Sequence, residues 1–191
     1  KFHEIAVQRV ATAVRTALRK PIPITHLGTG QAKVGKIASN RRYVLPDGKV
    51  SFGRGSASGR NVLAANAPEG IIDPWLKTIS FWNGDQPIAA LSGYATHPMS
   101  YYRTGEISAD FPGMARARRQ NDTPGCLQIY FSGASGNVTA GKYNTGARAN
   151  RVVLANRLYD GMATAWENTK RQPLTRIEIR VAIAKLSPRN H

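Results

Sequence analysis

The segment from residue 87 to 168 alternates strand and helix patterns, and this order constrains the fold more than any other feature of the chain. An almost continuously apolar run over 87–96 predicts a strand buried on both faces. Residues 109–120 predict a helix, which Ser108 is placed to cap, and 126–133 predict a second buried strand. Parallel strands need such a crossover, which is almost always right-handed. We therefore expect an α/β fold, a mixed β-sheet flanked by helices, with a βαβ unit over about 87–132.

The two strands of this unit point the same way, so the loops that follow them share one edge of the sheet. His97 comes directly after the first strand, and the glycine-rich loop 133–146 comes directly after the second. Open α/β sheets bind their ligands at the carboxyl edge. The order of elements therefore predicts a site that combines His97 with this loop.

The rest of the chain fits the same sheet. The pattern predicts a helix over 4–19 with an apolar stripe, a strand over 26–34, a hairpin partner over 76–82, a helix near 148–168 and a final strand over 174–184. In the long helix, the apolar side is expected to consist of Val152, Leu154, Leu158 and Met162. The stretch 35–61, rich in Gly, Ser and Arg, is long for a loop and indicates a functional excursion.

Composition bounds the class of protein. The 191 residues suit one domain, 41% of them are hydrophobic, and Cys126 is the single cysteine. We expect residues 1–191 to be a single partial domain from the interior of a longer protein, because the chain starts without Met and ends in a strand pattern. No apolar run approaches the roughly 20 residues of a membrane span.

The chain is strongly basic, with 27 Lys and Arg against 11 Asp and Glu and a net charge of +16. Such a balance favours anionic partners, for example an anionic membrane surface or nucleic acid. The charges are dispersed, however, and no nucleic-acid-binding motif accompanies them. A solvated basic surface is the simpler interpretation, and we expect no specific nucleic-acid partner.

The loop itself contains a near match to a phosphate-binding motif. Gly136 to Lys142 reads G-x-x-x-x-G-K, but Tyr143 stands where a magnesium-binding Ser or Thr is required. The next helix also begins several residues later. These departures argue against a nucleotide-binding loop.

A hydrolytic site is the alternative. Thr139 carries a hydroxyl in a glycine-flanked loop, and a nucleophilic hydroxyl needs a neighbouring base or metal. His97 is placed to supply an imidazole. Each residue also has an ordinary structural explanation, and one imidazole does not make a metal site.

Two strings resemble the N-terminal catalytic domain of neutral/alkaline ceramidases. They are "LSGYATHPMSYYRTGEISADFPGMARARRQ" and "QIYFSGASGNVTAGKYN", and "KIASNRRYVLPDGKV" adds to them. The resemblance extends over about 30–165 and is strongest over 88–143. It is closest to bacterial ceramidase-like proteins that share this domain.

The resemblance implies specific roles for the residues that match the family's motifs. His97 falls on a zinc-ligating histidine. Gly136, Asn137 and Thr139 fall on the Gly-Asp-Val-Ser motif, whose Ser is assigned as the nucleophile. Here Thr replaces that Ser and Asn replaces the acid, so Thr139 either attacks or only positions the attacking group.

Three further residues match the family. Arg41 falls on an arginine proposed to hold the substrate carbonyl or product carboxylate, and Asn40 precedes it in the family's Asn-Arg pair. Asp110 falls on the acidic residue of an "SGD" stretch.

The family implies a function as well as a fold. It is a zinc-dependent amidase that cleaves the N-acyl bond of ceramide, so we expect Zn²⁺, a lipid amide as substrate and an extracellular or periplasmic location. The other zinc ligands are expected outside this segment, which should be inactive alone. The alternatives are a basic binding module for nucleic acid or anionic lipid, and a ceramidase-like protein that has lost turnover.

Overall fold

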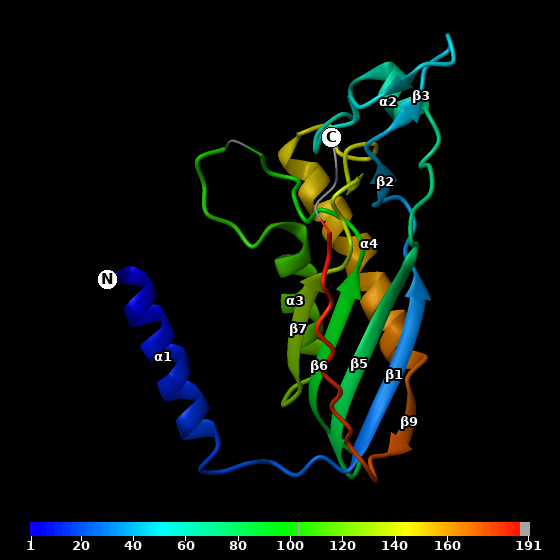
Figure 1. Ribbon diagram of the computed structural model, residues 1–191. Coiled ribbons are helices and arrows are strands. Elements are labelled where there is room, and N and C mark those ends of the chain that lie inside the picture. Colours follow the sequence, from blue (N-terminus) through cyan, green and yellow to red (C-terminus); the bar gives the residue numbers. More distant parts are fainter. Residues whose placement is uncertain (103, 188–191) are drawn as a thin grey trace.

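A mixed five-stranded sheet forms the centre of the molecule. The computed structural model describes residues 1–102 and 104–187. The sheet order is β7-β6-β5-β1-β9 (Figure 1). The strands are β1 (His26–Lys33), β5 (Trp75–Asn83), β6 (Gln86–Tyr94), β7 (Leu127–Ser132) and β9 (Lys170–Pro173). Neighbouring strands are antiparallel except β6 and β7, which are parallel.

The predicted βαβ unit is present as β6, helix α3 (Asp110–Asp122) and β7. With helix α4 (Arg148–Glu167), α3 covers one face of the sheet (Figure 1). The core between these layers includes Leu154, Leu158 and Met162 of α4, each 0–1% exposed. Val152 was expected among them but is 48% exposed. Val152 precedes the buried Leu154 by two residues, which is rather more than half a helical turn, so its side chain points away from the sheet.

The other face of the sheet carries no helix among the described residues. Ile79, Ile129 and Phe131 point from this face and are 44%, 39% and 50% exposed. The expectation that the 87–96 strand is covered on both faces is therefore wrong for the described chain. Its alternate residues pack under the helices, and the residues between them face outward.

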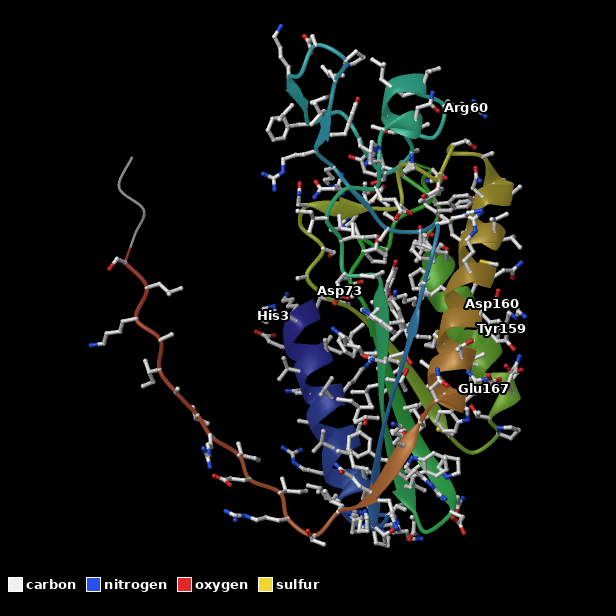
Figure 2. All side chains as sticks on the ribbon, turned by 90° about the vertical axis from the view of Figure 1, so that its right-hand side faces the viewer. His3, Arg60, Asp73, Tyr159, Asp160 and Glu167 are labelled. Atoms are coloured by element: carbon white, nitrogen blue, oxygen red, sulfur yellow. The ribbon has the colours of Figure 1, made fainter. Side chains whose placement is uncertain are left out.

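The two ends of the chain stand apart from this sheet. Helix α1 (Phe2–Ala17) forms as predicted but buries no residue. Figure 2 shows α1, marked by His3, and α4, marked by Tyr159 and Glu167, on opposite sides of the sheet. The final strand was predicted over 174–184, but the last strand is β9 and residues 174–187 form no strand. The Leu174 N–H donates to Thr25 O (2.8 Å), and no further backbone hydrogen bond joins residues 175–187 to another described segment.

The start of α3 departs from the expected cap. The N-cap residue is Ala109, and no side chain caps the helix. Instead, the N–H of Asp110 donates a hydrogen bond to the Ser108 hydroxyl (3.0 Å). The N–H of Phe111 donates to the Asp110 carboxylate (2.6 Å). Asp110 has a φ of 53°, a left-handed conformation that is uncommon for residues other than glycine.

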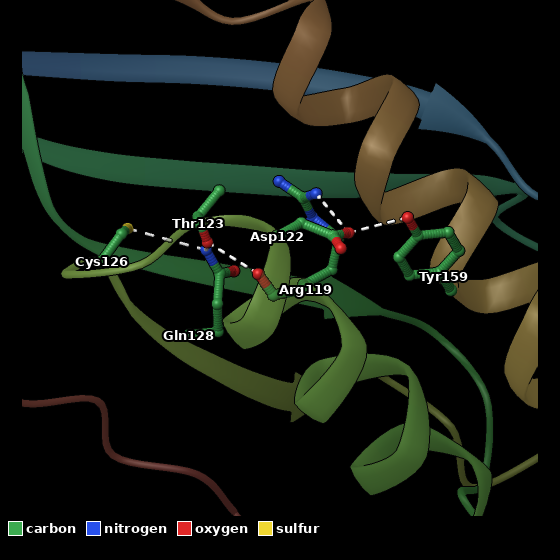
Figure 3. Close-up of polar contacts among 6 residues, drawn as sticks. All are labelled: Arg119, Asp122, Thr123, Cys126, Gln128 and Tyr159. Atoms are coloured by element: carbon green, nitrogen blue, oxygen red, sulfur yellow. Dashed lines mark hydrogen bonds and ion pairs between the residues drawn. The ribbon is translucent and has the colours of Figure 1, made fainter.

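The end of α3 is tied to both of its neighbours (Figure 3). Arg119, 6% exposed, forms an ion pair with Asp122 (3.1 Å), which also accepts a hydrogen bond from Tyr159 of α4 (2.7 Å). Gln128 of β7 donates to the Thr123 hydroxyl just after the helix (2.9 Å). These contacts fix the crossover helix, and with it the sheet edge where the candidate site lies.

The stretch expected to be a functional excursion contains short elements above that edge. They are β2 (Ser39–Asn40), β3 (Tyr43–Val44), β4 (Val50–Ser51) and, just beyond it, α2 (Val62–Asn66). In the glycine-rich loop, β8 (Val138–Thr139) pairs with β2, so the two loop regions meet directly.

Candidate functional site

Short strand pairings bring the predicted residues together at the carboxyl edge of the sheet. Ser39 lies opposite Thr139 in the antiparallel β2–β8 pair, although 100 residues separate them. His97 forms a parallel bridge with Thr139, and its N–H donates to Val138 O (3.1 Å). The N–H of Arg41 donates to Asn137 O (2.8 Å). The backbone therefore juxtaposes the histidine, the threonine and the Asn-Arg pair that the sequence singled out.

Thr139 is placed centrally, and its side chain is enclosed. The residue is 0% exposed, and its hydroxyl has no hydrogen-bond partner within the described chain. Its carbonyl accepts a hydrogen bond from the Ser39 hydroxyl (2.9 Å). An enclosed hydroxyl is better placed to shape the site than to reach a substrate.

Asn137 and Asn40 lie side by side beneath a guanidinium group that the sequence did not indicate. The Asn137 amide oxygen faces Arg42, because a guanidinium has only donors to offer. In this orientation it accepts from Arg42 Nε (3.1 Å) and Nη2 (3.0 Å). Arg42 thus fixes the Asn137 side chain, and Arg41 remains the candidate for holding a substrate oxygen. At Gly136, by contrast, an added side chain would meet open space.

Asp110 holds the loop that follows His97. Its carboxylate accepts the N–H groups of Ser100 (2.9 Å) and Tyr101 (3.0 Å), the hydroxyl of Ser100, and the N–H of Phe111. With these donors satisfied, the carboxylate is committed to structure. Its place in the site is to position His97 through this loop.

Asn144, which sequence reasoning missed, ties three loops together. It is fully buried, and its Nδ2 donates to Ser56 O (2.8 Å) and Ser100 O (3.0 Å). Its Oδ1 accepts the N–H of Gly146 (3.0 Å). The loop after His97 is therefore held by Asp110 on one side and by Asn144 on the other.

Arg54 is the second missed residue. Its guanidinium is fully buried and donates to four carbonyls, at 2.6 to 3.1 Å: Ala64 O, Ala67 O, Pro68 O and Asn40 O. Burial lowers the pKa of Arg54, and the nearby Tyr43 ring opposes that shift. The bond to Asn40 O connects this buried cation directly to β2.

The phosphate-loop resemblance has a structural explanation. Lys142 Nζ donates to Ala65 O and to Ala67 O (2.6 Å), next to the carbonyls that Arg54 binds. Burial lowers the pKa of Lys142, and the Arg54 charge adds to this effect. The Tyr143 hydroxyl donates to Glu69. Both side chains thus hold the end of α2, and neither is available for a phosphate.

Two clefts open near the carboxyl edge, with Phe131 lining both. The His97 cleft, of about 660 Å³, lies between the end of β7, the loop after His97 and the first turns of α3, and it includes Arg116 and Tyr130. The Val138 cleft, of about 570 Å³, is mostly apolar and is lined by residues 71–75 and 133–134 among others.

The described residues do not form a metal site by themselves. Nowhere in residues 1–102 or 104–187 do three His, Cys, Asp or Glu side chains gather so that they could hold a metal ion. Asp110 also lines the His97 cleft, but its carboxylate is taken up by the N–H groups of Ser100, Tyr101 and Phe111. A zinc ion at this position would therefore depend on ligands from beyond these residues.

A membrane-spanning helix is also not found: none of the helices in the described part of the chain is long and apolar enough to cross a bilayer.

Comparisons with known proteins give a likeness of fold. No protein family profile and no curated protein sequence matches the chain. Two solved structures do, the neutral ceramidase of Pseudomonas aeruginosa and a ceramidase complexed with C2. For each, the identity is 19%, the TM-score is 0.51, and the match covers 75% of this chain and 22% of the ceramidase chain. The chain thus spans about a fifth of these enzymes, and its fold is similar to that part of a bacterial ceramidase.

Proposed function

We propose that the chain is part of a ceramidase-like hydrolase that cleaves an N-acyl amide bond of a lipid amide. The observation that carries the proposal is the meeting of His97, Thr139 and Asn40–Arg41 through the β2–β8 pair and the His97 bridge. These residues come from three distant parts of the chain. The likeness of fold to ceramidases supports the same conclusion independently.

In this proposal, His97 contributes one ligand to a Zn²⁺ ion whose other ligands lie outside the 191 residues. When bound, zinc lowers the pKa of a water molecule and polarises a carbonyl. The residues of this chain orient the substrate. Arg41 offers a planar donor fork that suits a carbonyl or carboxylate oxygen. Arg42 holds Asn137 in place, and Thr139 shapes the floor of the site or shares in the attack.

The apolar Val138 cleft supports a lipid amide as substrate, because it lies beside the same edge and can take an acyl chain. The net charge of +16 suits an enzyme that works at an anionic membrane surface. We place the parent protein in an extracellular or periplasmic compartment, in line with the family resemblance.

The test is the metal content and activity of the full-length protein. His97→Ala should lower bound zinc at least tenfold, because one ligand is lost, and should abolish release of fatty acid from a short-chain ceramide. Zinc would be measured by mass spectrometry after dialysis. His3→Ala is the matched control, since His3 is an exposed histidine on α1. Unchanged zinc in His97→Ala would overturn the ligand assignment.

A further inference from the structure

We propose that the His97 cleft binds an anionic group of the substrate, which makes the substrate an N-acyl amide with a carboxylate beside the amide, such as an N-acyl amino acid. This inference rests on the proposed amide hydrolysis for the identity of the scissile bond. The anion site itself is argued from the side chains of the cleft.

Arg116 is the group that gives the cleft its charge. It is half-buried on the second turn of α3, and its guanidinium makes one long hydrogen bond, to Gln128 O (3.4 Å). Within residues 1–102 and 104–187, no carboxylate forms an ion pair with it. A half-buried arginine without a counter-ion favours an incoming carboxylate, to which its planar fork can donate two parallel hydrogen bonds.

The one carboxylate that lines the cleft, that of Asp110, does not pair directly with Arg116. Asp110 already accepts hydrogen bonds from Ser100, Tyr101 and Phe111, so it has little capacity to bind Arg116. A second cation lies at the same end of α3: Arg151 donates to the Ser108 hydroxyl (2.9 Å) and lies 4.0 Å from the Tyr101 ring centre.

Tyr130 adds a neutral donor. Its hydroxyl oxygen is buried, and no described group meets it in hydrogen-bonding geometry. Burial raises the pKa of Tyr130 to about 12, with the nearby Ser132 hydroxyl opposing the shift, so the phenol keeps its proton at neutral pH. The neutral phenol thus lines the cleft without adding a negative charge that would oppose an anionic ligand.

The Val138 cleft provides a contrast within the same molecule. There, the charges are paired with each other, because Lys77 Nζ contacts Asp73 Oδ2 at 3.0 Å. The two charges that line that cleft are in direct contact, whereas Arg116 and Asp110, which line the His97 cleft, do not pair with each other. We therefore assign the acyl chain to the Val138 cleft and the anionic end to the His97 cleft, with Phe131 between them.

The experiment compares the binding of three ligands to the chain by calorimetry, without turnover: N-lauroylglycine, N-lauroylethanolamide and laurate. We expect N-lauroylglycine to bind at least tenfold more tightly than the neutral amide, and the difference to shrink as salt rises. Arg116→Gln should weaken N-lauroylglycine about tenfold and leave the neutral amide unchanged.

Arg118→Gln is the matched control. Arg118 is on the same helix, but it donates to Asn156 (2.7 Å) and stacks on Tyr159, away from the cleft. Thermal melting of each variant would establish that it folds. Equal affinity for the two amides would overturn the inference, and so would laurate binding as tightly as N-lauroylglycine. A failure of the full-length protein to cleave any amide would instead overturn the proposed function, since the binding result does not depend on turnover.

Discussion

Thr139 and Thr78 are both buried threonines, and their hydroxyls have opposite surroundings. The Thr78 hydroxyl shares a hydrogen bond with the Ser92 hydroxyl (2.9 Å), whereas the Thr139 hydroxyl has no partner in the described chain. A fold retains an unpaired buried hydroxyl at a cost, because the group has lost its water. We take this as a sign that Thr139 is kept for the site rather than for stability.

This difference gives a prediction. Thr139→Val should raise the free energy of unfolding by about 1 kcal/mol, because it replaces an unsatisfied hydroxyl with a methyl group of similar size. Thr78→Val should lower it by about 1 kcal/mol, because it leaves Ser92 without its partner. Urea unfolding of the two variants measures both effects.

A loss of stability in Thr139→Val would show that the hydroxyl has a partner after all. In the full-length protein, Thr139→Ala separates the two roles. Retained amide cleavage would mean that Thr139 positions the attacking group, and a loss of more than about a thousandfold would mean that it attacks.

The sequence indicated some site residues and not others for a physical reason. His97 and Thr139 could be placed because each follows a strand, and parallel strands share an edge. Arg54 and Asn144 could not be identified from the sequence, because they bind backbone carbonyls of remote loops. Every residue has a backbone carbonyl, so the sequence does not show which one a side chain will bind. Arg54 looked like any other charge in a Gly, Ser and Arg-rich stretch.

At the scale of elements, polar contacts join the end of α3 to α4, among them Arg118 to Asn156 (2.7 Å) and Tyr159 to Asp122 (2.7 Å). The Tyr159 hydroxyl donates to Asp122 Oδ2, and this bond, with Arg119, holds the pKa of Asp122 below its usual value. A carboxyl group with a lowered pKa stabilises the fold above its unfolded-state pKa of about 3.9, and the contribution is lost as the pH falls through the folded-state value.

We therefore predict that Asp122→Asn destabilises the fold more at pH 7 than at pH 2.5, because the native carboxylate loses its charge, and with it this contribution, as the pH falls through the lowered folded-state pKa. Tyr159→Phe should raise the pKa of Asp122, which carboxyl NMR titration can measure. Asp160→Asn is the control, because Asp160 is exposed on the next position of α4 (Figure 2). An Asp122→Asn variant equally destabilised at both pH values would contradict the assignment to its charge.

Prediction of the elements succeeded where periodicity and pairing agreed. The βαβ unit was predictable because its strands are apolar and its helix lies between them in the chain. The absence of the strand expected over 174–184 was not predictable, because an alternation of apolar and polar residues shows only that a segment could pair with another strand. Whether it pairs depends on an available neighbour, and among the described residues β1 offers one only as far as Thr25.

At the scale of the whole molecule, the described chain is a sheet with helices on one face and apolar side chains exposed elsewhere. Ile79, Ile129 and Phe131 are exposed on the sheet, and α1 buries none of its apolar stripe. Exposed apolar surface of this kind is unusual in a protein that stands alone. The chain spans about a fifth of the ceramidases it resembles, which fits such a surface being covered in a larger assembly.

The detached position of α1 gives the last prediction. Deleting residues 1–20 should leave the free energy of unfolding within about 0.5 kcal/mol of its original value, because α1 buries no residue. A longer deletion, through Gly28, should lower it sharply, because it removes β1 residues that pair with both β5 and β9. Urea unfolding followed by the fluorescence of Trp82 and Trp166, whose rings stack at 5.1 Å, would report on that part of the sheet. A loss of more than about 1 kcal/mol in the shorter deletion would mean that the apolar stripe of α1 packs against the sheet in solution.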